Sequence, residues 1–222
     1  MDTNRNTARI VGLLLLLNFV IGVFINLFIL GPLTFAADYL TKVSANSNLI
    51  IIAVLFYLIG GCIYVGIAII LLPIFKQISQ RLALMFLSFS IISFTIIALD
   101  NLSILALLSI SKEYAKAVSP DASYLKALSS VFYAIRMWAH LLVVLVGCVS
   151  LFIFYYLLFQ SKQIPRFISI SGLLGVLLML IAVLIDIFGQ GLYMLLFLPA
   201  GIIQIAVAIW LMVKGFKKSA IT

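Results

Sequence analysis

Charged residues are scarce in this sequence, and acidic residues are the scarcest of them. Only 9% of the 222 residues are charged, and six acidic residues stand against 14 basic ones. A soluble domain has about a quarter of its residues charged, because it must cover its core with side chains that tolerate water. Since 66% of the chain is apolar and its mean hydropathy is +1.35, the composition excludes a soluble domain and predicts an integral membrane protein.

Cysteine and histidine are almost absent as well. Cys62 and Cys148 lie in apolar segments without a second Cys or His at a metal-binding or redox spacing. His140 is the only histidine, which excludes a site built on several imidazoles and a haem held by two histidines of one subunit. Motifs for phosphate loops, zinc hydrolases, nucleophile elbows and calcium loops are also missing from the sequence. We therefore expect no metal, no cofactor and no nucleotide chemistry.

The chain contains six long apolar segments. About 20 residues of helix cross the ~30 Å hydrocarbon layer of a bilayer, and a backbone in lipid must satisfy its own hydrogen bonds. The sequence therefore predicts an all-α, polytopic integral membrane protein, a single six-helix transmembrane domain over residues 1–222. The first segment is longer than the apolar part of a signal peptide, so we interpret it as an uncleaved helix. The expected spans are about 8–30, 48–75, 82–109, 129–159, 165–188 and 192–213.

Glycine and proline mark the expected ends of these helices. Gly31–Pro32 is predicted to stop the first helix, and Gly189–Gly191 to form a tight turn between the last two. Ser119–Asp121 offers a helix cap, which would let the fourth helix begin outside the membrane. Pro199 lies inside the last span, where we expect it to bend the helix and to leave the carbonyl of Leu195 free.

Basic residues at the helix ends indicate the orientation. Cytoplasmic loops of membrane proteins are enriched in Lys and Arg. This enrichment accounts for the net charge of +8, so nucleic-acid binding is not needed to explain it. One side collects nine basic residues and the other only four, so we expect both termini in the cytoplasm. The nine are Arg5, Arg9, Lys76, Arg81, Lys162, Arg166, Lys214, Lys217 and Lys218, and the four are Lys42, Lys112, Lys116 and Lys126.

Four ionisable residues lie within the predicted spans. An ionisable side chain at a helix centre costs about 2.5–3.5 kcal/mol on insertion scales, so such residues suggest a site. Counting along the helices places Asp100 and Asp186 near the outer boundary and Arg136 at a similar level, with His140 one turn deeper. We predict that Arg136 pairs with one of the two aspartates above His140, at the floor of an outward-facing pocket. The alternative is that these side chains reach the outer headgroups.

Two main function classes are compatible with these features. The first is a non-catalytic membrane protein that binds or moves a small molecule, a lipid or a proton through the polar pocket, with membrane lipids as its other partners. The second is an intramembrane enzyme in which His140 acts as general acid or base, and a purely structural protein is a third possibility. The candidate ligand-binding residues are Arg136, Asp100, His140, Asp186 and, beside Pro199, Gln204. The sequence does not predict an oligomeric state.

Several short stretches resemble one known family in their order and spacing. The resemblance spans nearly the whole chain, and the family is the bacterial six-helix membrane family known as domain of unknown function forty-three eighty-six. It implies a multi-pass protein of the bacterial cytoplasmic (inner) membrane, without an assigned reaction. The matching stretches are Asp38–Leu40 with Ala45–Asn46, Pro120–Tyr124, Arg136 with Trp138, Tyr155–Leu158 with Ser161 and Ile164–Arg166, and Trp210–Leu211 with Lys214–Phe216.

The orientation gives a first testable prediction. A cysteine placed at Ser123 should react with a membrane-impermeant thiol reagent in intact cells, because the segment between Lys112 and Lys126 is expected outside. Reaction of this cysteine only after the cytoplasmic face is opened would reverse the predicted orientation.

Overall fold

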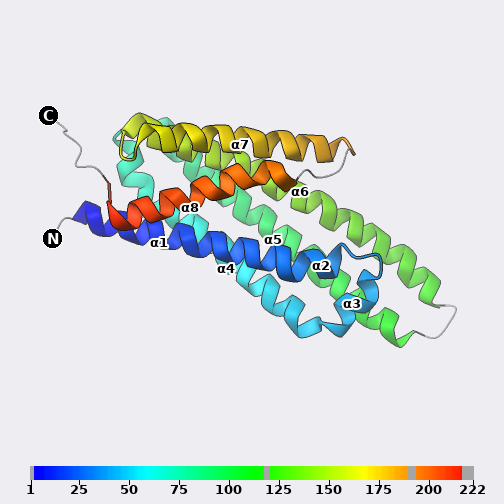
Figure 1. Cartoon of the computed structure of the whole chain (residues 1–222). Coiled ribbons are helices and arrows are strands. Elements are labelled where there is room, and N and C mark those ends of the chain that lie inside the picture. Colours follow the sequence, from blue (N-terminus) through cyan, green and yellow to red (C-terminus); the bar gives the residue numbers. More distant parts are fainter. Residues whose placement is uncertain (1–2, 118–120, 190–193, 217–222) are drawn as a thin grey trace. The chain divides into compact units, whose positions relative to one another are not determined.

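The computed structural model describes residues 3–117, 121–189 and 194–216, and in these ranges the chain is helical without any strand. Figure 1 shows the helices in chain order. They are α1 (Thr3–Phe24), a π-helical turn (Ile25–Leu30), α2 (Gly31–Thr34), α3 (Tyr39–Ala45), α4 (Ser47–Lys76), α5 (Gln80–Lys116), α6 (Asp121–Ser161), α7 (Arg166–Ile187), a 3₁₀ turn (Met194–Phe197) and α8 (Leu198–Val213).

Six stretches of the described chain are long and apolar enough to cross a membrane, which confirms the predicted fold class. The chain is therefore a multi-pass membrane protein. The stretches are Arg5–Thr34, Ser47–Lys76, Gln80–Lys116, Ser123–Ser161, Arg166–Ile187 and Met194–Val213.

The residues group into two compact units. Unit 1 comprises Met1–Phe19, Cys62–Ser93 and Val144–Thr222, and unit 2 comprises Val20–Gly61 and Phe94–Val143. Each boundary falls within a helix of the chain, in α1, α4, α5 and α6.

Unit 1 is held together by aromatic contacts and by close approaches at glycine. The rings of Phe75 and Phe86 meet edge to face at 5.7 Å, and Phe154 lies 5.7 Å from Phe86. Figure 1 shows α7 and α8 side by side, and a Cβ on Gly175 of α7 would lie only 2.9 Å from the backbone nitrogen of Ala200 in α8. Small residues at such points let helix backbones approach closely, as expected in membrane bundles.

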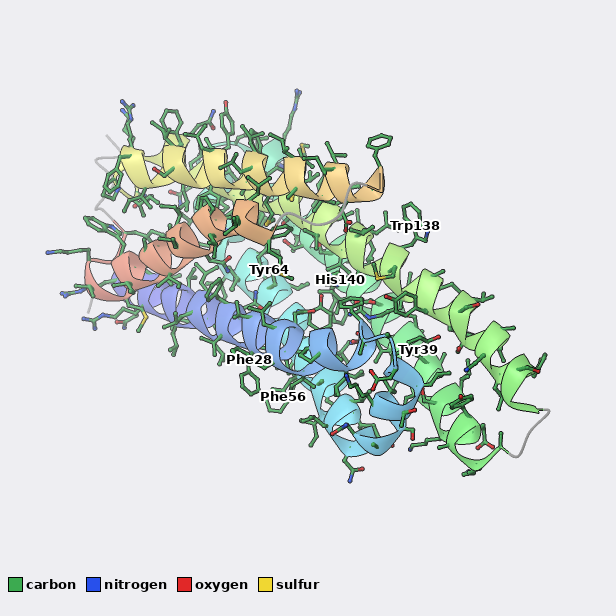
Figure 2. The ribbon with its side chains drawn as sticks, turned by 45° about the vertical axis from the view of Figure 1, so that its right-hand side comes forward. Phe28, Tyr39, Phe56, Tyr64, Trp138 and His140 are labelled. Atoms are coloured by element: carbon green, nitrogen blue, oxygen red, sulfur yellow. The ribbon has the colours of Figure 1, made fainter. Side chains whose placement is uncertain are left out.

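Unit 2 has its own apolar core, which is built by the π-helical turn, α3 and segments of α4 and α5. Its buried side chains include Ile29, Val43, Ile50 and Leu108. Figure 2 shows that Phe28 and Phe56 project away from this core, and both are exposed.

The prediction that Gly31–Pro32 stops the first helix is wrong. The helix continues to Thr34, with Pro32 in the first turn of α2, where its missing N–H removes no necessary bond. The preceding turn is π-helical, so the amide of Gly31 donates to the carbonyl oxygen of Asn26. The wider turn thus accommodates the proline without ending the helix.

Other boundaries differ because polar segments also form helix. Neither α3, in the first predicted loop, nor the extension of α5 from Ser109 to Lys116 was expected. Beyond Ser109 the exposed residues of α5 are Lys112, Glu113, Ala115 and Lys116, while Ile110 and Ser111 are buried, so this extension is amphipathic. α6 begins at Asp121, as the helix cap allowed; Ser119, Pro120, Gln190 and Gly191 lie outside the described residues.

Pro199 lies inside the span Met194–Val213, as predicted, but close to a change of helix type. A 3₁₀ turn over Met194–Phe197 precedes α8, and Pro199 lies in the first turn of α8. A proline in that turn lacks only an N–H that would have no helical partner. The bend of this span and the free carbonyl of Leu195 stay predictions.

The π-helical turn yields a second prediction. A Cβ on Gly31 would lie 2.6 Å from the carbonyl oxygen of Asn26, so Gly31→Ala should destabilise the protein by about 1–3 kcal/mol. The matched control is Gly22→Ala in α1, where nothing lies within 4 Å of the added Cβ and where alanine favours helix by about 0.5–1 kcal/mol. Thermal unfolding midpoints of the detergent-solubilised proteins should fall for the first variant only. Equal midpoints would contradict the close approach at Gly31.

Candidate functional site

A buried ion pair forms the centre of the candidate site in unit 2. Nη1 of Arg136 in α6 lies 2.9 Å from Oδ1 of Asp100 in α5, and both side chains are fully buried. Of the two aspartates considered as partners for Arg136, Asp100 is the one in contact. The pairing explains how a cation and an anion persist among apolar helices, because each offsets part of the desolvation of the other.

Helical periodicity places both residues on inward faces. On α5, Asp100 continues a buried stripe with Ile104 and Leu108 at four-residue intervals. On α6, Arg136 follows buried Ser129 by seven residues, or two turns, and therefore faces the same way. The apolar pattern that buries these faces also buries the two charges.

His140 lies at the edge of the pair. Its Nδ1 is 3.9 Å from Oδ2 of Asp100, and 23% of its side chain is exposed. Figure 2 shows His140 and Trp138 on opposite sides of α6, with Trp138 pointing outward. At 3.9 Å the imidazole feels the carboxylate charge but does not form a hydrogen bond. His140 thus connects the buried pair to the surface of the unit.

Phe35 covers the guanidinium group and was not predicted. Cζ of Arg136 lies 5.3 Å from the centre of the Phe35 ring, within the range of a cation–π interaction. The same ring lies 6.1 Å from the imidazole of His140 and is 40% exposed. Phe35 follows α2 directly, so the unexpected continuation of the first helix brings it over the site. An isolated aromatic residue after a helix carries no sequence signal for such a role.

Most polar atoms of the cluster lack a hydrogen bond. Among the described residues, all three guanidinium nitrogens of Arg136, both carboxylate oxygens of Asp100 and Nδ1 of His140 are buried without a hydrogen-bond partner. The 2.9 Å contact is therefore a charge contact whose angles are poor for a hydrogen bond. A buried donor without a partner costs about 1–3 kcal/mol, so this arrangement is incomplete as it stands.

Further polar side chains lie around the pair. The side chain of Asn101 donates a hydrogen bond of 3.3 Å to the carbonyl of Val54, while its own carbonyl oxygen has no partner within the described chain. Tyr57 of α4 is buried, interacts with the side chain of Asn26 and is close enough to feel the charges of Asp100 and Arg136. These polar residues resemble ordinary helix-packing residues in the sequence, and only the fold gathers them around a charge.

The cluster lies close to the polar end of unit 2. On α5 the exposed apolar surface reaches Leu102, two residues beyond Asp100, and the next strongly exposed residue is Ser109. On α6 it begins at Val131, five residues or about 7.5 Å before Arg136, after exposed Ser130. The ion pair therefore lies just inside the edge of the apolar belt, at the end that carries Lys112 and Lys126.

The other two predicted residues belong to unit 1. Asp186 is partly buried near the end of α7, and Gln204 is partly buried within α8. The structure brings Asp100, Arg136 and His140 together within unit 2, whereas a meeting of Asp186 and Gln204 with this cluster stays a prediction. Among the described residues, no three His, Cys, Asp or Glu side chains are grouped as metal ligands.

A double-mutant cycle tests the pairing. Arg136→Met strands the Asp100 carboxylate in an apolar environment and should destabilise the protein by about 3–5 kcal/mol. Adding Asp100→Asn should recover about 2 kcal/mol or more, because the second change removes the stranded anion. The measurement is the unfolding free energy in detergent for the wild type, both single variants and the double variant.

The surface pair Asp38–Lys42 provides the control. Its side chains lie 2.9 Å apart but are largely exposed, and the hydrogen bond from Lys42 lowers the pKa of the Asp38 carboxyl. Asp38→Asn and Lys42→Met should have small effects, because water replaces the partner at the surface. Additive effects for Arg136 and Asp100 would contradict their coupling.

The comparisons with known proteins agree with the architecture. No curated protein and no solved structure matches the chain significantly. One family model, described as Domain of unknown function (DUF4386), matches residues 10–215 and so includes both units and every candidate site residue. The chain therefore belongs to the DUF4386 family of membrane proteins of unknown function.

Proposed function

We propose that this protein is a non-catalytic membrane protein that binds a small molecule or lipid carrying a carboxylate or phosphate group at Arg136. The observation that carries the proposal is the fully buried guanidinium group whose nitrogens lack hydrogen-bond partners among the described residues. We further propose that it resides in the bacterial cytoplasmic membrane, with both termini inside and the polar end of unit 2 outside.

The chemistry of the guanidinium group supports an acidic ligand. Arginine presents five N–H donors in a planar fork, which matches two oxygens of a carboxylate or phosphate. Asp100 contacts Nη1, and Nε and Nη2 of Arg136 have no hydrogen-bond partner within the described chain, so both remain available to a second oxyanion. Such a ligand would satisfy donors that otherwise stay unpaired in a low-dielectric environment.

The surroundings provide selectivity and a route of entry. Asp100 balances the charge of Arg136, so a fully ionised ligand leaves the cluster with one excess negative charge. A protonated His140, 3.9 Å from Asp100, would compensate this excess. Phe35 and His140 are the partly exposed side chains over the pair, and a movement of the Phe35 ring would open the guanidinium group to the polar end.

The alternative of an intramembrane enzyme has less support. A general base is oriented by a partner within about 2.6–3.2 Å, whereas His140 and Asp100 are 3.9 Å apart. Covalent catalysis would also place a hydroxyl or thiol within hydrogen-bond distance of the imidazole, whereas Nδ1 of His140 has no hydrogen-bond partner in the described chain. The geometry thus favours binding over covalent chemistry.

Thermal shift measurements test the proposal. Acetate, butyrate, succinate, inorganic phosphate and glycerol phosphate are added to the detergent-solubilised protein, with chloride at equal ionic strength as the reference. A ligand at one hundred times its Kd stabilises by about 2.7 kcal/mol, so at least one acid should raise the unfolding midpoint by several degrees.

Two variants make this test specific. Arg136→Lys keeps the charge opposite Asp100 but loses the planar fork, so the ligand-induced shift should disappear. Lys126→Gln removes an exposed cation from the same helix and should leave the shift unchanged. Equal shifts in wild type and Arg136→Lys, or no shift with any of the five acids, would refute the proposed function.

A further inference from the structure

Unit 1 contains an apolar groove that is separate from the Arg136 cluster. It has a volume of about 540 Å³, and α5, α6 and α7 contribute its walls. Met85, Phe152 and Leu177 line it and are themselves exposed, so the groove opens on the side of the helices rather than being sealed in the core. In a membrane such a groove is filled by a hydrocarbon chain.

Polar groups mark one end of this groove. Tyr156 lines the groove, and its hydroxyl accepts a hydrogen bond of 2.9 Å from Nε2 of Gln160 one turn further along α6. Gln160 directly precedes Ser161, the last residue of α6. Tyr156 and Gln160 thus place a small polar patch where the groove reaches the end of the helices.

Two exposed arginines lie at the same end, on the faces that form the groove. Arg81 precedes Met85 by four residues at the start of α5, so the two side chains share a face. Arg166 precedes Leu177 by eleven residues at the start of α7, which is close to three full turns and again the same face. Its guanidinium group lies 5.6 Å from the ring of Phe159, beside the end of α6.

This end of unit 1 has a strongly positive charge. Lys162 adds another exposed cation between α6 and α7. Among the described residues of unit 1, the only acid is Asp186, which lies at the opposite end of α7. An anionic group at this end would meet several cations and no described carboxylate.

We propose that the groove binds an anionic diacyl phospholipid, with one acyl chain along Met85, Phe152 and Leu177 and the phosphate group near Arg81 and Arg166. The apolar walls select a hydrocarbon chain, and the two guanidinium groups select a phosphate headgroup with a net negative charge. The Gln160–Tyr156 pair provides hydrogen-bonding groups for the headgroup or glycerol oxygens at the polar end of the groove. Lipid binding here does not depend on the function proposed for Arg136.

Native mass spectrometry of the purified full chain provides the test. The protein in detergent is mixed with phosphatidylglycerol or with phosphatidylcholine of the same acyl chains, and the retained lipid is counted. Phosphatidylglycerol should bind about 25-fold more tightly, since each of the two arginines near the headgroup contributes about a fivefold preference. The double variant Arg81→Gln, Arg166→Gln should lose this preference, whereas Lys214→Gln at the end of α8 should retain it.

Neighbouring residues on α7 give a matched pair for the groove itself. Leu177→Trp fills the groove from a position that is 42% exposed, whereas Leu174→Trp alters a 56% exposed residue that does not line it. Only the first should reduce lipid retention, by about tenfold or more. Both variants must elute like the wild type in size-exclusion chromatography. If Leu177→Trp does not elute in this way, Val149→Phe on the facing helix α6 repeats the test.

Three outcomes would overturn the inference. Equal binding of the two lipids by the wild type would exclude a phosphate site at the arginines. Equal retention by the Leu177→Trp and Leu174→Trp variants would exclude the groove as the binding site. Loss of a dimer in the Leu177→Trp variant, with unchanged lipid retention, would assign the groove to a second copy of the chain. None of these outcomes alters the thermal shifts expected from acids at Arg136, so the two proposals fail independently.

Discussion

The contact between Arg136 and Asp100 is the interaction on which unit 2 depends. Both side chains are fully buried, and their charged atoms are 2.9 Å apart. In lipid-facing helices an isolated charge is costly, and two separate charges would each require water or a partner. Their pairing therefore favours the register in which α5 and α6 place these residues opposite each other. Apolar contacts alone tolerate small shifts along a helix, whereas a buried pair does not.

The unusual end of the first helix brings an aromatic ring to this pair. An α-helical path through Gly31–Pro32 would place the proline ring against the carbonyl four residues earlier. The π-helical turn over Ile25–Leu30 replaces the α-helical hydrogen bonds between residues four apart with bonds between residues five apart. The chain then reaches Phe35 in helical conformation, and the Phe35 ring lies over the guanidinium of Arg136. The π-helical turn, which has one extra residue, thus helps to position Phe35 over the guanidinium group of Arg136. π-helical turns of this kind are frequent at functional sites.

The sequence alone predicts the six spans, because twenty or more apolar residues in succession have few other structures available in a membrane. It also identifies Asp100, Arg136 and His140, since ionisable residues in such spans are rare. It does not reveal Phe35, Tyr57 or the apolar groove, because each arises from the packing of segments distant in the chain. A single-residue rule also fails at Gly31–Pro32, where a local π-helical turn accommodates the proline.

A structural role for the ion pair and a binding role make different demands on the same atoms. A pair retained only for packing is best when every donor and acceptor is satisfied within the protein, since each unsatisfied buried group weakens the fold. Here Nε and Nη2 of Arg136 and Oδ2 of Asp100 remain without hydrogen bonds in the described part of the chain. Completing this network takes water or a ligand, and the cluster lies within about two turns of the polar end, where both are available. Water satisfies single donors, but a planar oxyanion satisfies two donors of the fork at once and at fixed geometry. This match of the fork to two oxygens is why we propose an acid rather than solvent as the partner of Arg136, with Phe35 placed over the guanidinium group.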